Sequence, residues 1–175
     1  MCAIQILELE SNLLKEIPAT IGVLGQLRRL DISSNSLLDL PDTFIGCGEL
    51  RQLCLHSNQL TYIPPSIGNG CLKLEYMDVS RNHLETIGEE VRKLIDLTYL
   101  DASYNRLALI PRDIGNCTKL RFLDVSRNQL TTLPESFRNL TCLESCNLEH
   151  NIIKVIGSMI STIPFVHANQ PTYSD

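Results

Sequence analysis

The stretch that decides the fold is LDVSRNQL at residues 123–130, because it occurs nearly unchanged as MDVSRNHL at residues 77–84. A third version, LDASYNRL at residues 100–107, lies midway between them. Each version begins 23 residues after the previous one. The chain therefore contains an internal repeat of 23 residues, which has to be identified before any single strand or helix is predicted.

The same pattern extends along almost the whole chain. Each copy fits LxxLxLxxNxLxxIPxxIGxLxxL, and only the third copy is one residue longer, because of an insertion near Gly70. Residues 4–166 form the predicted array, whose last residue, Val166, opens an incomplete eighth copy, and residues 167–175 form a polar tail. The seven predicted copies begin at Ile4, Leu27, Leu50, Leu74, Leu97, Leu120 and Leu143.

The spacing inside one copy predicts a short strand followed by a sharp turn. Positions 4 and 6 are two residues apart, so on a strand they share the inward face, while positions 3, 5 and 7 point outward. Position 9 is always Asn, whose amide can both donate to and accept from the backbone groups that a turn leaves unpaired. We predict a structural ladder made of Asn12, Asn35, Asn58, Asn82, Asn105, Asn128 and Asn151.

The second half of each copy returns along the other side of the stack. Pro follows position 14 in five copies and suits the first turn of a helix, while Gly88 and Gly157 replace it in the fourth and seventh copies. Because one repeat cannot bury its own apolar stripe, stacked repeats have to cover one another. We predict an α/β fold, a right-handed solenoid curved like a horseshoe, with a concave parallel sheet and short helical or irregular convex returns.

Composition narrows the possible functions. The 175 residues carry a net charge of −5 with acids and bases interspersed, which argues against a nucleic-acid partner. No apolar run approaches the roughly 18 residues of a membrane span, and the N-terminus does not resemble a secretory signal. The seven cysteines include no CxxC pair, so we expect reduced thiols, no metal and a cytoplasmic location. No nucleotide-binding motif occurs, so we expect no cofactor.

These features resemble the leucine-rich repeat family. The repeat length and the IPxxIG motif are similar to its intracellular subclass, which includes Ras-linked scaffolds, Scribble-like polarity proteins and some bacterial effectors. The resemblance covers residues 4 to about 166 and implies a horseshoe with a concave binding face. It does not identify a partner.

The outward positions supply the candidate binding residues. Tyr76, Tyr99 and Phe122 occupy position 3 of three successive copies, and Tyr104 occupies position 8 of the fifth. Clustered exposed aromatic residues are typical of interaction hot spots, and we predict that they bind a protein partner. The alternative is that aromatic residues simply favour strands and shield one another.

Position 5 carries an acidic column, Asp78, Asp101 and Asp124, which would attract a basic partner. The alternative is that these carboxylates accept local hydrogen bonds in the turn. Arg81 and Arg127, at position 8, are predicted to neutralise the column in part and to belong to the same surface.

Cys54 and His56 are the one pair that resembles a catalytic site, with Asp31 or Asp78 beside them. Residues i and i+2 of a strand lie nearly 7 Å apart by their Cα atoms, and an open sheet supplies no oxyanion hole. We therefore predict no catalytic residues and no enzyme activity.

The sequence favours a non-enzymatic module that binds a protein on its concave face, as a signalling scaffold or adaptor. One alternative is the recognition domain of a larger multidomain enzyme or of a bacterial effector. We expect a monomer, and the alternative is association end to end through open terminal repeats. Met1 lies almost at the first strand, so we expect either a fragment of a longer protein or a minimal array.

Overall fold

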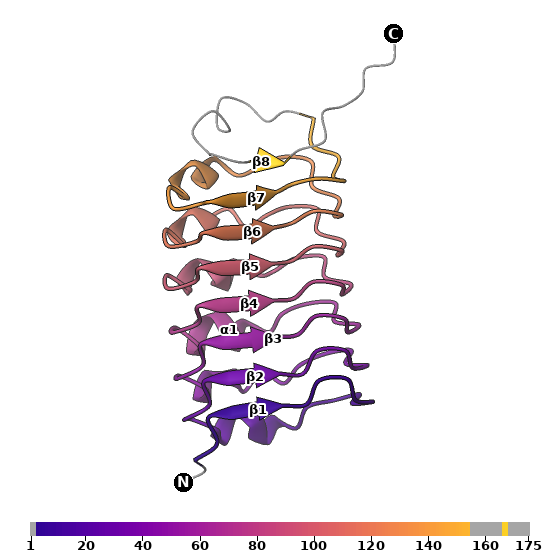
Figure 1. The fold of residues 1–175 in the computed structure, drawn as a ribbon, viewed down its shortest axis with the longest axis vertical. Helices are drawn as coiled ribbons and strands as arrows, with labels where there is room; N and C mark the ends of the chain where they lie inside the picture. The colour runs from indigo at the N-terminus through magenta and orange to yellow at the C-terminus, as the bar shows by residue number, and fades with distance from the viewer. Residues whose placement is uncertain (1–2, 155–165, 168–175) are drawn as a thin grey trace.

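The computed structural model describes residues 3–154 and 166–167, and in them the chain stacks one short strand per repeat (Figure 1). All neighbouring strands are parallel and follow one another in chain order across a single sheet. The strands are β1 (Ile6–Glu8), β2 (Arg29–Asp31), β3 (Gln52–Cys54), β4 (Tyr76–Asp78), β5 (Tyr99–Asp101), β6 (Phe122–Asp124), β7 (Ser145–Asn147) and β8 (Val166–His167). This parallel ladder is the sheet that the repeat pattern predicts.

The returns between the strands are short helices packed behind the sheet (Figure 1). Five are 3₁₀ helices: η1 (Ala19–Val23), η2 (Phe44–Gly46), η3 (Glu89–Lys93), η4 (Ile114–Asn116) and η5 (Glu135–Asn139). The third return, which contains the inserted residue, forms α1 (Pro65–Gly70), the one α-helix among the described residues. Pro18, Pro64 and Pro134 lie just before a helix in extended conformation, not in its first turn as predicted.

Glycine permits two features of these returns. Gly88 precedes η3 with φ of 80°, a left-handed conformation that explains why Pro is replaced in the fourth copy. Gly115 lies so close to the next return that an added Cβ would be 2.1 Å from the Ser136 carbonyl oxygen. The predicted difference at Gly157 lies outside the described residues.

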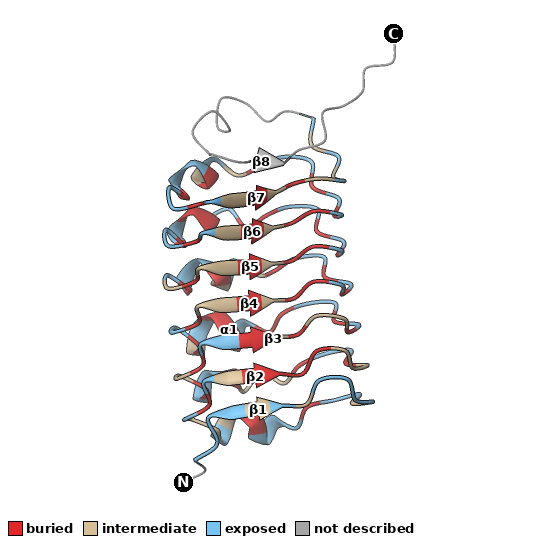
Figure 2. Cartoon of the chain, in the orientation of Figure 1, coloured by how far each residue is buried: buried red, intermediate tan, exposed pale blue. Residues whose placement is uncertain are grey.

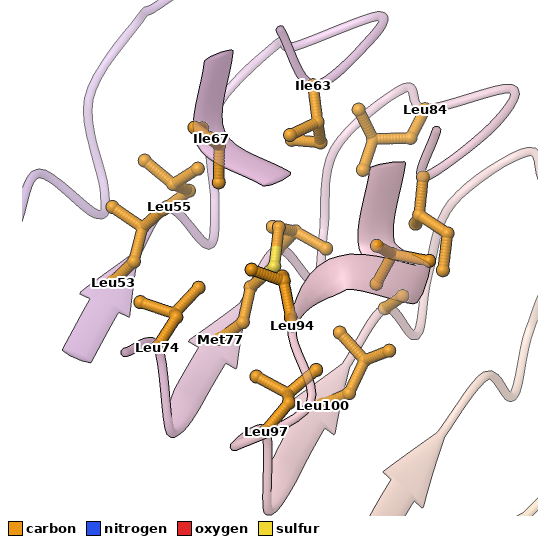
Figure 3. Packing of buried hydrophobic residues seen from close by; sticks show 14 of the residues in the cluster. Leu53, Leu55, Ile63, Ile67, Leu74, Met77, Leu84, Leu94, Leu97 and Leu100 are labelled. Atoms are coloured by element: carbon orange, nitrogen blue, oxygen red, sulfur yellow. The ribbon is translucent and has the colours of Figure 1, made fainter. Parts of the chain in front are cut away.

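The core is a continuous column of aliphatic side chains between the sheet and the returns. Buried residues run through every level of the stack (Figure 2). Figure 3 shows Leu53, Met77 and Leu100 from three neighbouring strands pointing into the same interior, where each is at most 1% exposed. Because each repeat contributes the same positions, adjacent repeats cover one another's apolar surface.

The C-terminal end of the sheet differs from the prediction. Val166 pairs with Cys146, the fourth position of the seventh copy, so it is not the first residue of an eighth copy. The residue of β8 that pairs with Cys146 therefore comes three positions earlier in the sequence than a 23-residue repeat predicts. β8 also extends to His167, the first residue of the predicted tail, while residues 168–175 lie outside the described residues.

Candidate functional site

The turn after each strand is organised by the asparagine at position 9. In the fifth repeat, the Asn105 side-chain amide donates to the carbonyls of Val79, Ala102 and Ser103, and its Oδ1 accepts from the Leu84 N–H. Two of these four partners belong to the preceding repeat. The amide therefore joins neighbouring turns as well as closing its own turn. Similar bonds are made by Asn35, Asn58, Asn82, Asn128 and Asn151, and Asn12 makes only those to its own turn.

The residue before each asparagine has a left-handed backbone. Position 8 has φ between 52° and 56° in all seven repeats. The sequence did not reveal this feature, because the position holds Ser, Arg, Tyr or His and never Gly or Asn. The residues concerned are Ser11, Ser34, Ser57, Arg81, Tyr104, Arg127 and His150. This conformation ends the strand and presents the exposed side chains of Arg81, Tyr104 and Arg127 beside the outward face of the sheet.

Three aromatic rings stack on the outward face of β4, β5 and β6. The ring centroids of Tyr76 and Tyr99 are 4.3 Å apart, and those of Tyr99 and Phe122 are 4.4 Å apart, with interplanar angles of 10° and 3°. We call these residues the aromatic stack. All three are half-buried, and burial raises the pKa of Tyr76 and Tyr99. Neighbouring rings cover one another's faces, which leaves the ring edges at the outward surface of the sheet.

The aspartates of position 5 form an in-register column next to the aromatic stack. Asp78 pairs with Asp101, and Asp101 pairs with Asp124, on adjacent strands. Burial raises the pKa of Asp101, and the charges of Asp78 and Asp124 raise it further, while hydrogen bonds from Ser103 lower it. The column therefore contains repulsion between like charges.

These aspartates also hold the turn, as the alternative interpretation predicted. Ser80 donates both its N–H and its hydroxyl to Asp78 Oδ1, at 3.0 and 2.7 Å. The N–H of Ser126 donates to Asp124 at 2.8 Å. The serines of position 7 are buried in these turns, which corrects the prediction that position 7 points outward. The buried serines are Ser33, Ser80, Ser103 and Ser126.

In the described part of the structure, the arginines of position 8 do not pair directly with the aspartates. Arg81 and Arg127 place their guanidinium carbons 4.6 and 4.9 Å from the centroid of the Tyr104 ring. Among the described residues, neither arginine forms an ion pair. We call Arg81, Tyr104 and Arg127 the Arg–Tyr–Arg cluster. Direct pairing with the aspartates is therefore replaced by cation–π contact, which holds both guanidinium groups over the ring.

Cys54 and His56 do not form a nucleophile and base. The His56 Nδ1 lies 3.2 Å from the Ser57 hydroxyl, and within the described part of the chain it makes no hydrogen bond to Cys54. Burial, followed by the charges of Asp31 and Asp78, raises the pKa of the Cys54 thiol to about 12. The thiolate that a nucleophile requires is therefore strongly disfavoured near neutral pH.

The described residues were expected to hold no metal site and no membrane span. They contain no group of three or more His, Cys, Asp or Glu arranged to hold a metal ion. The helices in this part of the chain are all too short or too polar to cross a membrane.

Comparison with known proteins identifies the family. A family model described as leucine rich repeat matches residues 2–60 and 49–107, and a second model with the same description matches residues 119–140. The chain therefore belongs to the leucine-rich repeat proteins, and the predicted horseshoe fold is confirmed. No curated protein sequence matches the chain.

Solved structures agree on the fold. The ectodomain of the plant membrane receptor kinase GASSHO1/SCHENGEN3 from Arabidopsis thaliana, in complex with Casparian strip integrity factor 2, is 30% identical, with a TM-score of 0.83 over 94% of this chain. The plant peptide hormone receptor RGFR1, in complex with RGF2, is 30% identical, with a TM-score of 0.77 over 91% of the chain. The Listeria monocytogenes protein InlP is 30% identical, with a TM-score of 0.69 over 82% of the chain. This chain covers 22%, 28% and 39% of those chains, respectively.

Proposed function

We propose that the chain is a non-enzymatic module that binds a protein partner on its concave face, as a signalling scaffold or adaptor. The observation that carries this proposal is the aromatic stack on three adjacent strands. Tyr76, Tyr99 and Phe122 lie at outward positions and are not part of the aliphatic core. Aromatic side chains contribute a large contact area at a small cost in conformational entropy, which makes them frequent anchors of interfaces.

The stack is also preorganised. Each ring is held by its neighbour at 4.3 or 4.4 Å and by a backbone fixed in the sheet, so a partner orders little on binding. The ring edges carry the positive part of the aromatic quadrupole. A row of such edges suits carbonyl groups or ring faces of a partner. The two plant receptors were solved in complexes, which supports ligand binding by this architecture.

The proposal excludes catalysis and places the module in the cytoplasm. The raised pKa of Cys54 and the absence of a hydrogen bond between it and His56 in the described part of the chain support the first point. Six cysteines in the described residues are free thiols, and Cys47, Cys71, Cys117 and Cys146 are fully buried in the core. Reduced thiols in the core suit a reducing compartment, which supports the second point. The intracellular subclass of the family belongs to the same proposal.

A second candidate is the recognition domain of a larger multidomain enzyme or of a bacterial effector. The observation that favours it is the size of a similar protein, because this chain covers only 22% of the ectodomain of the plant receptor kinase. In that case the same concave face selects the partner, and another domain acts on it.

The test compares capture by the native chain with capture by Tyr76→Ala/Tyr99→Ala. The amount of lysate protein captured by the double variant should be at least about tenfold lower than the amount captured by the native chain, because two anchor side chains are removed. Ile95→Ala is the matched control, because Ile95 is 56% exposed in the return after η3. Circular dichroism verifies that all three proteins are folded. Equal capture by the double variant and the native chain would reject the aromatic stack as the binding surface.

A further inference from the structure

The Arg–Tyr–Arg cluster has a geometry of its own. Arg81, Tyr104 and Arg127 occupy the same position in three successive repeats, so the two arginines approach the ring from opposite faces. Distances of 4.6 and 4.9 Å to the ring centroid place the guanidinium carbons about 10 Å apart at most. Tyr104 is 42% exposed, so both charges lie beside an accessible surface.

The two guanidinium groups are held in place but have no anionic partner among the described residues. Eight ion pairs occur there, and most of the other exposed arginines, including Arg51 and Arg121, take part in them. The nearby aspartates Asp78 and Asp124 already accept hydrogen bonds from their own turns. Each guanidinium therefore retains donors in a planar fork that suits a carboxylate.

The backbone fixes the base of each side chain as well. Arg81, Tyr104 and Arg127 all have φ of 53°, in turns closed by Asn82, Asn105 and Asn128. The cluster is held at both ends, by the turn at the backbone and by the ring at the guanidinium groups. Less side-chain entropy is lost when such groups bind a ligand than when free arginines do so.

We propose that the Arg–Tyr–Arg cluster docks two carboxylates of the protein partner, carried by acidic residues three positions apart in an extended segment. This inference rests on the proposed function and adds the chemistry of the partner. An extended chain advances about 3.1 Å per residue in the polyproline II conformation, so residues i and i+3 lie about 9 Å apart on one side of the chain. That spacing matches the two guanidinium groups. The segment lies along the stack of repeats, on the opposite side of the aspartate column from the aromatic stack.

The neighbouring charges add specificity. The column of Asp78, Asp101 and Asp124 repels acidic groups, so carboxylates are favoured over the cluster and disfavoured over the column. An acidic segment that is shifted sideways therefore loses affinity. This arrangement fixes the position of the segment across the strands.

The test uses NMR of the arginine Nε–H groups with synthetic peptides. The probe is the capped hexapeptide Gly-Glu-Pro-Pro-Glu-Gly, in which two prolines hold the glutamates three residues apart in extended form. Controls replace both glutamates with glutamine or place them next to each other. We expect the resonances of Arg81 and Arg127 to shift when the probe is added and to stay in place with the glutamine peptide. The adjacent-glutamate peptide should need about fivefold higher concentration to give the same shift.

Four variants test whether peptide binding depends on the Arg–Tyr–Arg cluster and not on the overall charge of the protein. Arg81→Asn and Arg127→Asn each remove one guanidinium while keeping a residue that tolerates positive φ, and each should weaken probe binding about fivefold or more. Tyr104→Asn removes the ring and should also weaken binding, whereas Tyr104→Phe keeps the ring and should bind as the native chain does. Arg106→Asn is the matched control, because Arg106 is an exposed arginine outside the cluster.

Four results would overturn the inference. Binding of the glutamine peptide as strong as that of the probe would exclude the carboxylates, and native affinity in both arginine variants would exclude the cluster. Stronger binding of a helical diacidic peptide or of a phosphoserine peptide would exclude the extended diacidic segment. Loss of the captured partner in Tyr76→Ala/Tyr99→Ala with full retention in Arg81→Asn/Arg127→Asn would reject this inference and leave the proposed function standing.

Discussion

The substitution Asn105→Ala tests how strongly the asparagine ladder holds neighbouring repeats together. The native amide donates to three carbonyls, at 3.0 to 3.1 Å, and accepts from the Leu84 N–H at 2.9 Å. Asn105 is only 9% exposed, so water does not readily replace these bonds. Alanine removes all four bonds and keeps the fold of the strand.

The magnitude follows from what each partner retains. The Val79 carbonyl still accepts from Asn82, and the Ala102 carbonyl still accepts from Asn128. The Leu84 N–H, however, has no other acceptor among the described residues and is left unpaired. An unpaired buried N–H costs about 1–3 kcal/mol, and each lost bond to a retained carbonyl costs about 0.5–1 kcal/mol. We expect Asn105→Ala to lower the free energy of unfolding by about 3 kcal/mol.

Asn12→Ala is the matched control in the first repeat. Asn12 is exposed and donates only to the carbonyls of Leu9 and Glu10 in its own turn. Water can replace these two bonds, so we expect a loss below about 1 kcal/mol. The difference between the two variants measures the bonds that link repeats.

Urea unfolding followed by far-ultraviolet circular dichroism measures both losses at pH 7. The reasoning predicts a clearly larger fall in the transition midpoint for Asn105→Ala than for Asn12→Ala, with similar slopes. Equal losses in the two variants would refute the idea that the ladder couples one repeat to the next. A slope that changes in one variant alone would show that the substitution alters how the array unfolds.

Three further predictions concern the returns, the aspartate column and the thiols. Gly115→Ala should lower the free energy of unfolding by about 2 kcal/mol in thermal unfolding, because the added Cβ would lie 2.1 Å from the backbone of the next return. Gly25→Ala should be nearly neutral, because its added Cβ would lie 3.5 Å from the nearest atom of the neighbouring return. Asp101→Asn should raise stability at pH 7 by about 0.5 kcal/mol by removing like-charge repulsion. The raised pKa of this carboxyl means that its ionisation destabilises the fold as pH rises, so the gain should shrink towards pH 3, and a pH-independent gain would contradict this. Cys54, with a thiol pKa of about 12, should react with a maleimide at pH 7.5 at least tenfold more slowly than the exposed Cys142, as mass spectrometry of the peptides would show.

The sheet and its register were predictable because the side-chain pattern repeats. The spacing of the apolar positions 4 and 6 places Leu100 and Ala102 in the core, and both are fully buried. The inserted residue near Gly70 marks the one return that forms an α-helix in the described residues. The burial of Leu100 and Ala102 follows from periodicity alone, since a shift by one residue would turn every apolar side chain outward. The α-helix of the third return was not predicted, because the sequence indicated only short helical turns.

The geometry of the turn was less predictable. Left-handed conformations are usually signalled by Gly or Asn, but here Arg81, Tyr104 and Arg127 adopt them because the asparagine that follows closes the turn. The strand spacing indicated that the three aromatic side chains share a column, and their face-to-face stacking depends on rotamers that no sequence pattern specifies. The cation–π contact of the arginines was missed for the same reason. Charge alone suggested the aspartates as their partners.

The most direct test of the central claim is site-specific photo-crosslinking on the two sides of the solenoid. A benzophenone amino acid is introduced at Gln52, the exposed residue of β3 that pairs with Tyr76 on the concave face, or at Ile95, in the return after η3. We expect the captured partner to be crosslinked from position 52 and not from position 95. Crosslinking from position 95 with none from position 52 would contradict the proposed binding face.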